Sequence, residues 1–92
     1  MIDSVKVTVD FFKNGICDAV DTLASERNTT RHKAAVDIFK AALGGDISVS
    51  FDDKNMIVEF PKFFFDASRE AGKDEETIIR DCVTNGMLKL QA

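Results

Sequence analysis

Tryptophan and tyrosine are absent from this 92-residue sequence, and proline occurs once. No apolar run approaches the roughly 18 residues that a membrane-spanning helix needs. The N-terminal residues also lack the basic and apolar blocks that define a signal peptide. We therefore expect a protein of the cytoplasm.

Cysteine and the known catalytic motifs are equally scarce. Cys17 and Cys82 each lie in an apolar helical pattern, without a CxxC motif or a histidine cluster, so we interpret them as free buried thiols. The sequence contains no GxGxxG, P-loop, GxSxG or HExxH motif. We predict a protein with no enzymatic activity, no cofactor and no bound metal.

The excess of negative charge is confined to one half of the sequence. Residues 1–43 carry six basic and six acidic side chains, whereas residues 44–92 carry six basic and ten acidic ones. Sequence-independent binding to nucleic acids depends on neutralising phosphates. The acidic half therefore argues against a large surface of that kind, while a small local contact through the neutral half stays open.

Periodicity predicts a strand and two helices in the first half. Residues 5–9 alternate β-branched and polar side chains, which is typical of a strand with one buried face. An amphipathic helix follows at residues 16–24. A second helix is expected at residues 31–43, because Thr29 or Thr30 supplies a capping oxygen before it and Gly44-Gly45 is a suitable stop after it.

The second half predicts a hairpin, two helices and a last strand. Pro61 suits the first turn of a helix, Asp74 suits a helix N-cap, and Gly86 reads as a helix stop. The expected elements are strands at 47–51 and 56–60 around a polar turn at 52–55, helices at 62–71 and between Asp74 and Asn85, and a strand at 87–90.

These elements give an α+β fold with the order β-α-α-β-β-α-α-β. The pair Gly44-Gly45 is the one credible boundary between lobes. It separates residues 1–43 from an acidic hairpin and two-helix segment at 44–92. The two segments are expected to form either separate lobes or one cooperative unit.

Residues 5–43 resemble the ribbon-helix-helix family of DNA-binding regulators. The likeness lies in the strand and in the sequence around the inter-helix turn, Leu23-Ala24-Ser25-Glu26-Arg27-Asn28-Thr29-Thr30-Arg31. The resemblance implies a homodimer whose paired strands enter the DNA major groove. It also implies base contacts from Lys6 and Thr8 and a phosphate clamp formed by Thr29, Thr30 and Arg31.

Two structural alternatives to the ribbon stay open. The strand at 5–9 can pair with its own hairpin in a monomeric sheet with the helices packed across it, because both arrangements bury the same valines. Thr30 is then only a helix cap. Residues 31–90 also allow a winged-helix-like interpretation, with residues 52–55 at the tip of the wing.

A protein-binding function is the alternative to DNA binding. Residues 63–65 are three consecutive phenylalanines, which cannot all face one core from a helix. We expect Phe63 or Phe65 to stay outside as an interface anchor. Together with the acidic charge of residues 44–92, this predicts a small inhibitor or adaptor, for example from a mobile element. We interpret His32 as an exposed or phosphate-adjacent side chain. Residues 52–55 are interpreted as a turn, and residues 74–76 as the start of a helix.

Overall fold

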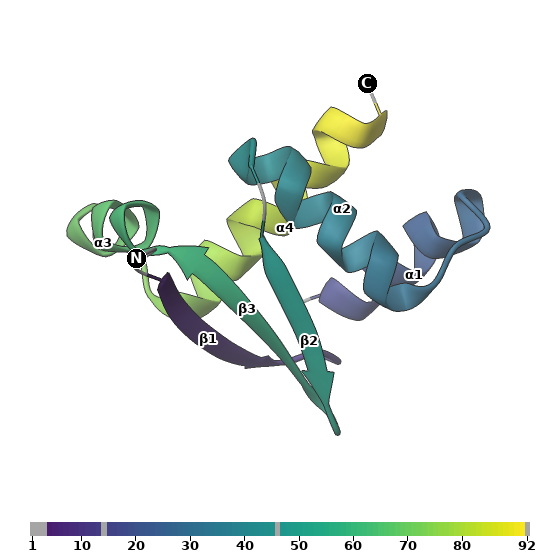
Figure 1. Cartoon of the computed structure of the whole chain (residues 1–92), viewed down its shortest axis with the longest axis horizontal. Helices are drawn as coiled ribbons and strands as arrows, with labels where there is room; N and C mark the ends of the chain where they lie inside the picture. Colours follow the sequence, from purple (N-terminus) through teal and green to yellow (C-terminus); the bar gives the residue numbers. More distant parts are fainter. Residues whose placement is uncertain (1–3, 14, 46, 92) are drawn as a thin grey trace.

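The computed structural model describes residues 4–13, 15–45 and 47–91. Its elements are β1 (Ser4–Asp10), α1 (Ile16–Glu26), α2 (Arg31–Leu43), β2 (Ser48–Asp52), β3 (Asn55–Pro61), α3 (Lys62–Glu70) and α4 (Glu75–Gln91). The α+β class and the order β-α-α-β-β-α-α are confirmed (Figure 1). The last strand expected at 87–90 is wrong, because these residues continue α4.

The strands form one antiparallel sheet in the order β1-β3-β2. β1 pairs with β3 over its whole length, from Ser4 opposite Pro61 to Asp10 opposite Asn55. The first strand therefore pairs with the chain's own hairpin. Because β1 belongs to residues 1–43 and β3 to residues 44–92, the two segments of the sequence share one sheet.

One face of the sheet is buried and the other is open to solvent. Val7, Val58 and Val49 lie side by side in register, and all three are buried. The neighbouring row, Thr8, Ile57 and Ser50, lies on the opposite face, because successive side chains of a strand alternate. Helices α1, α2 and α4, together with Phe11 from the loop after β1, supply the rest of the core beneath the buried face (Figure 1).

Helices α2 and α4 cross in close contact at Gly86. A β-carbon at this position would overlap the backbone carbonyl of Ile38 in α2. The sequence predicted that Gly86 ends the fourth helix, but α4 continues through it. The glycine is needed because no side chain fits between the two helices, and not because the helix stops there.

The predicted caps of α2 and α4 are confirmed. The Thr30 hydroxyl accepts a hydrogen bond of 3.1 Å from the Lys33 amide at the start of α2. Gly44, at a φ of 74°, ends the same helix. The Asp74 carboxylate accepts a hydrogen bond of 2.8 Å from the Thr77 amide and so caps α4. Within the described residues, no helix combines the length and apolar character needed to cross a membrane.

Candidate protein-binding surface

The residues predicted to contact DNA lie on different sides of the sheet. Lys6 and Thr8 are exposed on the open face, where Lys6 lies opposite Glu59. Thr30 and Arg31 lie at the start of α2, on the face that the helices cover. Thr29 is half-buried in the turn between α1 and α2. The structure thus brings the three clamp residues together but separates them from Lys6 and Thr8.

The guanidinium of Arg31 already contacts two other side chains of the protein, Asp21 and Phe11. Its Nε and Nη2 donate to the two carboxylate oxygens of Asp21 at 2.9 and 3.0 Å. The same group lies 4.9 Å from the centre of the buried Phe11 ring. The Arg31 hydrogen bond holds the pKa of Asp21 below its usual value. A phosphate at this position would have to compete with a bidentate carboxylate for the same donors.

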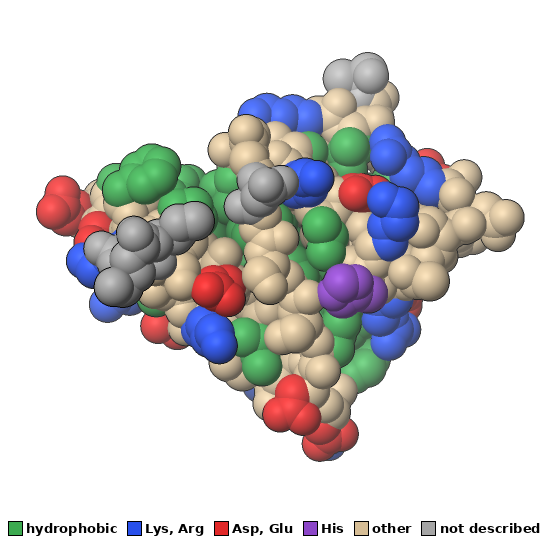
Figure 2. All heavy atoms as spheres, viewed as in Figure 1, with side chains coloured by type: hydrophobic (Ala, Val, Ile, Leu, Met, Phe, Trp, Pro, Cys, Tyr) green, Lys and Arg blue, Asp and Glu red, His purple; other side chains and the backbone are tan. Residues whose placement is uncertain are grey.

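Lys and Arg side chains gather over α1 and α2, and acidic ones mark the hairpin tip (Figure 2). Asp52 ends β2, and Asp53 follows it in the turn. Two carboxylates at this tip would repel the phosphates that the wing of a winged-helix protein contacts.

The outer edge of β2 is partly covered by His32. Its Nε2 lies 2.6 Å from the Val49 carbonyl oxygen, and its ring meets the ring of Phe51 edge-on. His32 therefore connects the start of α2 to β2.

The outer edge of β1, by contrast, has no strand beside it in the described part of the chain. The Phe11 amide donates to the Lys54 carbonyl at 2.8 Å, which continues the β1–β3 register by one residue. Hydrogen-bonded residues alternate along an antiparallel pair. Val5, Val7 and Val9 consequently bond to β3, whereas Lys6 and Thr8 direct their backbone N–H and C=O groups away from it. We call these outward groups, from Ser4 to Asp10, the β1 edge; at its end, the Asp10 carbonyl already accepts a hydrogen bond from the Lys13 amide at 3.3 Å.

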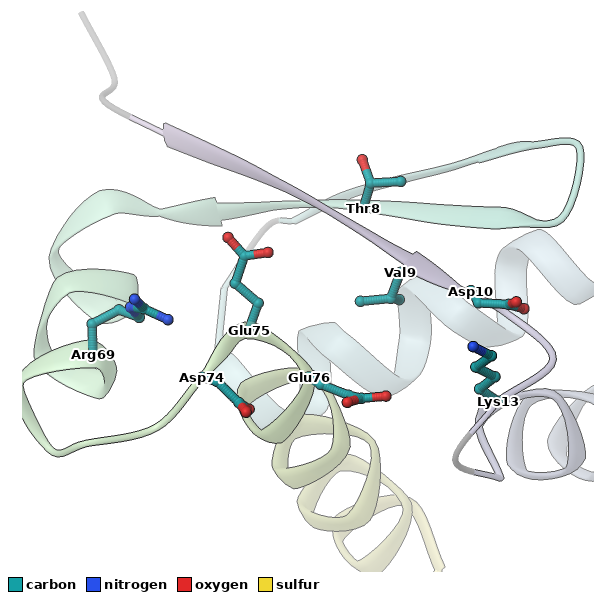
Figure 3. A pocket seen from close by; sticks show the side chains of 8 residues that line it. All are labelled: Thr8, Val9, Asp10, Lys13, Arg69, Asp74, Glu75 and Glu76. Carbon is teal, nitrogen blue, oxygen red and sulfur yellow. The ribbon is translucent and has the colours of Figure 1, made fainter.

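A shallow acidic hollow lies beside the β1 edge. Figure 3 shows β1 passing over the N-terminus of α4, with Val9 directed to the helix side and Thr8 to the opposite side. The hollow has a volume of about 460 Å³. Four carboxylates and two cations line it, together with part of β1; its residues are Thr8, Val9, Asp10, Lys13, Arg69, Asp74, Glu75 and Glu76.

The phenylalanines of α3 separate into one exposed and two packed rings. The Phe63 side chain is 79% exposed. Phe64 stacks on the buried Phe60 at a centroid distance of 5.8 Å, and Phe65 lies 6.3 Å from the same ring. Of the two predicted anchors, only Phe63 offers its ring to a partner.

A second exposed phenylalanine, Phe12, lies two residues beyond the end of β1 and is 59% exposed. Phe63 is two residues beyond Pro61, which pairs with the first residue of β1. One exposed phenylalanine ring thus lies close in sequence to each end of the β1–β3 pairing.

Both cysteines are free, as predicted, but only Cys82 is buried, since Cys17 is half-buried. Burial, with a smaller contribution from the charge of Asp81, raises the pKa of Cys82 to about 11. Burial and a hydrogen bond to Asp21 also raise the pKa of Cys17. No group of three or more His, Cys, Asp or Glu side chains in the described ranges is placed to hold a metal ion.

Sequence reasoning found Phe63 but missed the β1 edge and the acidic hollow. The alternation in residues 5–9 identifies the outward side chains, but it does not say which edge of the strand stays unpaired. Residues 74–76 were interpreted as a helix start, and their approach to β1 depends on the packing of α4. Comparison with protein-family models, with curated proteins and with solved structures found no match for the chain.

Proposed function

We propose that this chain is a non-catalytic protein-binding module of the cytoplasm, acting through Phe63 and the adjoining acidic surface. The observation that carries the proposal is the exposure of Phe63 on α3, a helix without a single buried residue. Exposed aromatic rings are frequent anchors of protein interfaces.

The charge around this ring supports a protein partner better than a nucleic acid. Residues 62–76 carry five acidic and three basic side chains, and Lys62 pairs with Asp66 on α3 at 2.8 Å. The excess of negative charge lies at the start of α4, where Asp74, Glu75 and Glu76 follow one another. Carboxylates repel phosphates but attract the lysines and arginines of a protein surface. The acidic surface would therefore select among proteins rather than hold DNA.

Affinity capture with matched variants tests the proposal. Phe63→Ser should abolish capture of a protein partner, because the ring is lost while the core keeps its packing. Leu88→Ser is the control, since Leu88 is 64% exposed on α4 and carries no role in the proposed surface. Equal capture by the wild type and the Phe63 variant would contradict the proposal.

A sequence-specific DNA-binding homodimer is the second candidate. The β1 edge favours it, because a second copy of β1 can pair there and place two sets of Lys6 and Thr8 side by side. The width of the sheet counts against it. Six strands at about 4.8 Å spacing span about 24 Å, twice the roughly 12 Å of the major groove.

The DNA-binding candidate is tested by its oligomeric state and its readout residues. It requires a dimer that persists at low micromolar concentration in light scattering. It also requires that the Lys6→Ala/Thr8→Ala double variant keep the fold and lose specific DNA binding. A clean monomer, or unchanged DNA binding in the double variant, would remove this candidate.

A further inference from the structure

We propose that the protein partner binds as an extended strand added to the β1 edge, with lysine or arginine side chains over the acidic hollow. This inference rests on the proposed protein-binding function and names the partner's conformation and charge. The unpaired backbone groups of β1 indicate that the partner binds as a strand, and the carboxylates beside them indicate that its side chains are basic.

The backbone of β1 presents a ready set of donors and acceptors. Lys6 and Thr8 each direct an N–H and a C=O outward, as the Phe11–Lys54 hydrogen bond establishes. The seven residues of β1 offer about 20 Å of extended edge. Proline is absent from this strand, so no outward donor is missing. A partner strand can therefore continue the sheet beyond β1.

The opposite edge of the sheet is a poorer site. β2 has five residues, two fewer than β1. The carbonyl of Val49 already contacts the His32 ring. A strand added beside β2 would have to displace α2 from this contact. A strand beside β1 meets one described backbone hydrogen bond, from Lys13 to Asp10 at the end of that edge.

The acidic hollow selects the charge of the partner. Side chains of an added strand alternate between the open face and the helix side. Those on the helix side would extend over the hollow beneath β1, where Glu75 points toward the strand (Figure 3). Four carboxylates face two cations in its lining. Lysine or arginine at alternate positions of the partner complements this excess.

A second copy of the chain fits the same edge less well. A two-fold axis that pairs two β1 strands keeps the helices of both copies on one side of the continuous sheet. Two acidic hollows would then adjoin each other, each with four carboxylates. Like charges brought together in this way oppose association. We therefore assign the edge to a different, basic chain.

Three synthetic peptides separate the contributions of strand pairing and charge. The first is a nine-residue peptide that alternates threonine and lysine, the second replaces every lysine with glutamate, and the third keeps the lysines but carries N-methyl groups at alternate backbone positions. Binding is followed by NMR through the amide signals of Lys6 and Thr8. The lysine peptide should bind at least tenfold more tightly than either of the others.

Matched protein variants locate the site. Thr8→Pro removes an outward donor without breaking a β1–β3 hydrogen bond, and should abolish binding of the lysine peptide. Glu75→Gln/Glu76→Gln should weaken it several-fold. Asp18→Asn/Glu26→Gln removes the same charge from exposed positions of α1 and should leave binding unchanged. If Thr8→Pro fails to fold, the N-methylated peptide decides the point.

Each contrary outcome would overturn one part of the proposal, either the strand addition or the charge of the partner. Equal binding of the N-methylated peptide would eliminate strand addition, and equal binding of the glutamate peptide would eliminate the basic partner. A dimer in light scattering that is lost in Thr8→Pro would assign the edge to a second copy. If no peptide binds while Phe63→Ser still abolishes capture of a protein, the inference fails and the proposed function stands.

Discussion

Gly86 of α4 lies directly against the backbone of Ile38 in α2. A β-carbon at Gly86 would overlap the carbonyl oxygen of Ile38, and it would lie 2.8 Å from the Cγ2 atom of the Ile38 side chain. Backbone cannot rotate aside as a flexible side chain can, so relief would require the two helices to separate. Both helices contribute to the core around this contact, with Phe39 and Ile79 fully buried. The spacing of α2 and α4 therefore depends on a single missing methyl group.

Gly86→Ala should destabilise the protein despite the higher helix propensity of alanine. Overpacking of this kind costs about 1–3 kcal/mol, against a propensity gain of about 1 kcal/mol. We expect a lower urea midpoint and a melting temperature reduced by several degrees. Asn85→Ala is the control, because this exposed neighbour gains helix propensity, up to about 0.7 kcal/mol, without a clash. A Gly86 variant as stable as this control would contradict the close contact.

Asp21→Asn should lower stability at neutral pH and lose its effect in acid. Arg31 lowers the pKa of Asp21, so the folded protein keeps this carboxylate charged to a lower pH than the unfolded chain does. The stabilisation is fully present above the unfolded pKa and disappears as the pH falls through the folded one. Because the pair is partly exposed, we expect at most about 1 kcal/mol.

Urea denaturation from pH 7 down to pH 3 measures this effect. Asp18→Asn, on the same helix, serves as the control for removal of a carboxylate. A stability difference between wild type and Asp21→Asn that grows as the pH falls would contradict the predicted direction.

Cys82 should react with alkylating reagents only when the protein unfolds. Its pKa of about 11 leaves very little thiolate at pH 8, and its side chain is buried. Mass spectrometry after iodoacetamide treatment, with and without urea, measures the difference. The Cys17→Ser variant isolates the signal of Cys82. Rapid modification of that variant under native conditions would show that the α4 face opens.

His32→Leu should weaken the attachment of α2 to β2. The side chain would lose its contact with the Val49 carbonyl, worth about 0.5–1.5 kcal/mol for a typical hydrogen bond. His32→Gln can still donate to that carbonyl and should recover part of the loss. Urea unfolding of the three proteins gives the comparison. If glutamine and leucine are equally destabilising, the hydrogen bond is not the source of the effect.

Local patterns in the sequence identified most of the secondary structure. The alternation at residues 5–9 and the apolar stripes of the helices depend on short-range periodicity, and the structure has elements at these places. The sequence identifies Asp74 as a cap and Thr30 as one of two candidates with Thr29, because capping is a local hydrogen bond. The prediction that Gly86 ends the fourth helix is wrong for the same reason. Local sequence patterns indicate a helix stop at a glycine, whereas the environment of Gly86 is determined by Ile38, which is distant in the sequence.

The partner of β1 and the binding surface could not be derived in this way. Pairing with β3 and pairing with a second copy both bury Val7, so burial patterns do not distinguish them. The difference between Phe63 and Phe65 arises because Phe65 reaches the Phe60 ring. That contact depends on where α3 lies against β3, which the composition of residues 63–65 does not encode.

The pairing of β1 with β3 also bears on how the chain is made. The hydroxyl of Ser4 donates to the carboxylate of Glu59, across 55 residues of sequence. During synthesis β1 leaves the ribosome before the hairpin with which it pairs, so its valines have no sheet to join until β3 has followed. Such distant contacts slow folding and expose strands to misassociation. β1 is thus translated well before the strand that secures it, whereas α1 and α2 form through contacts between residues that are close in the sequence.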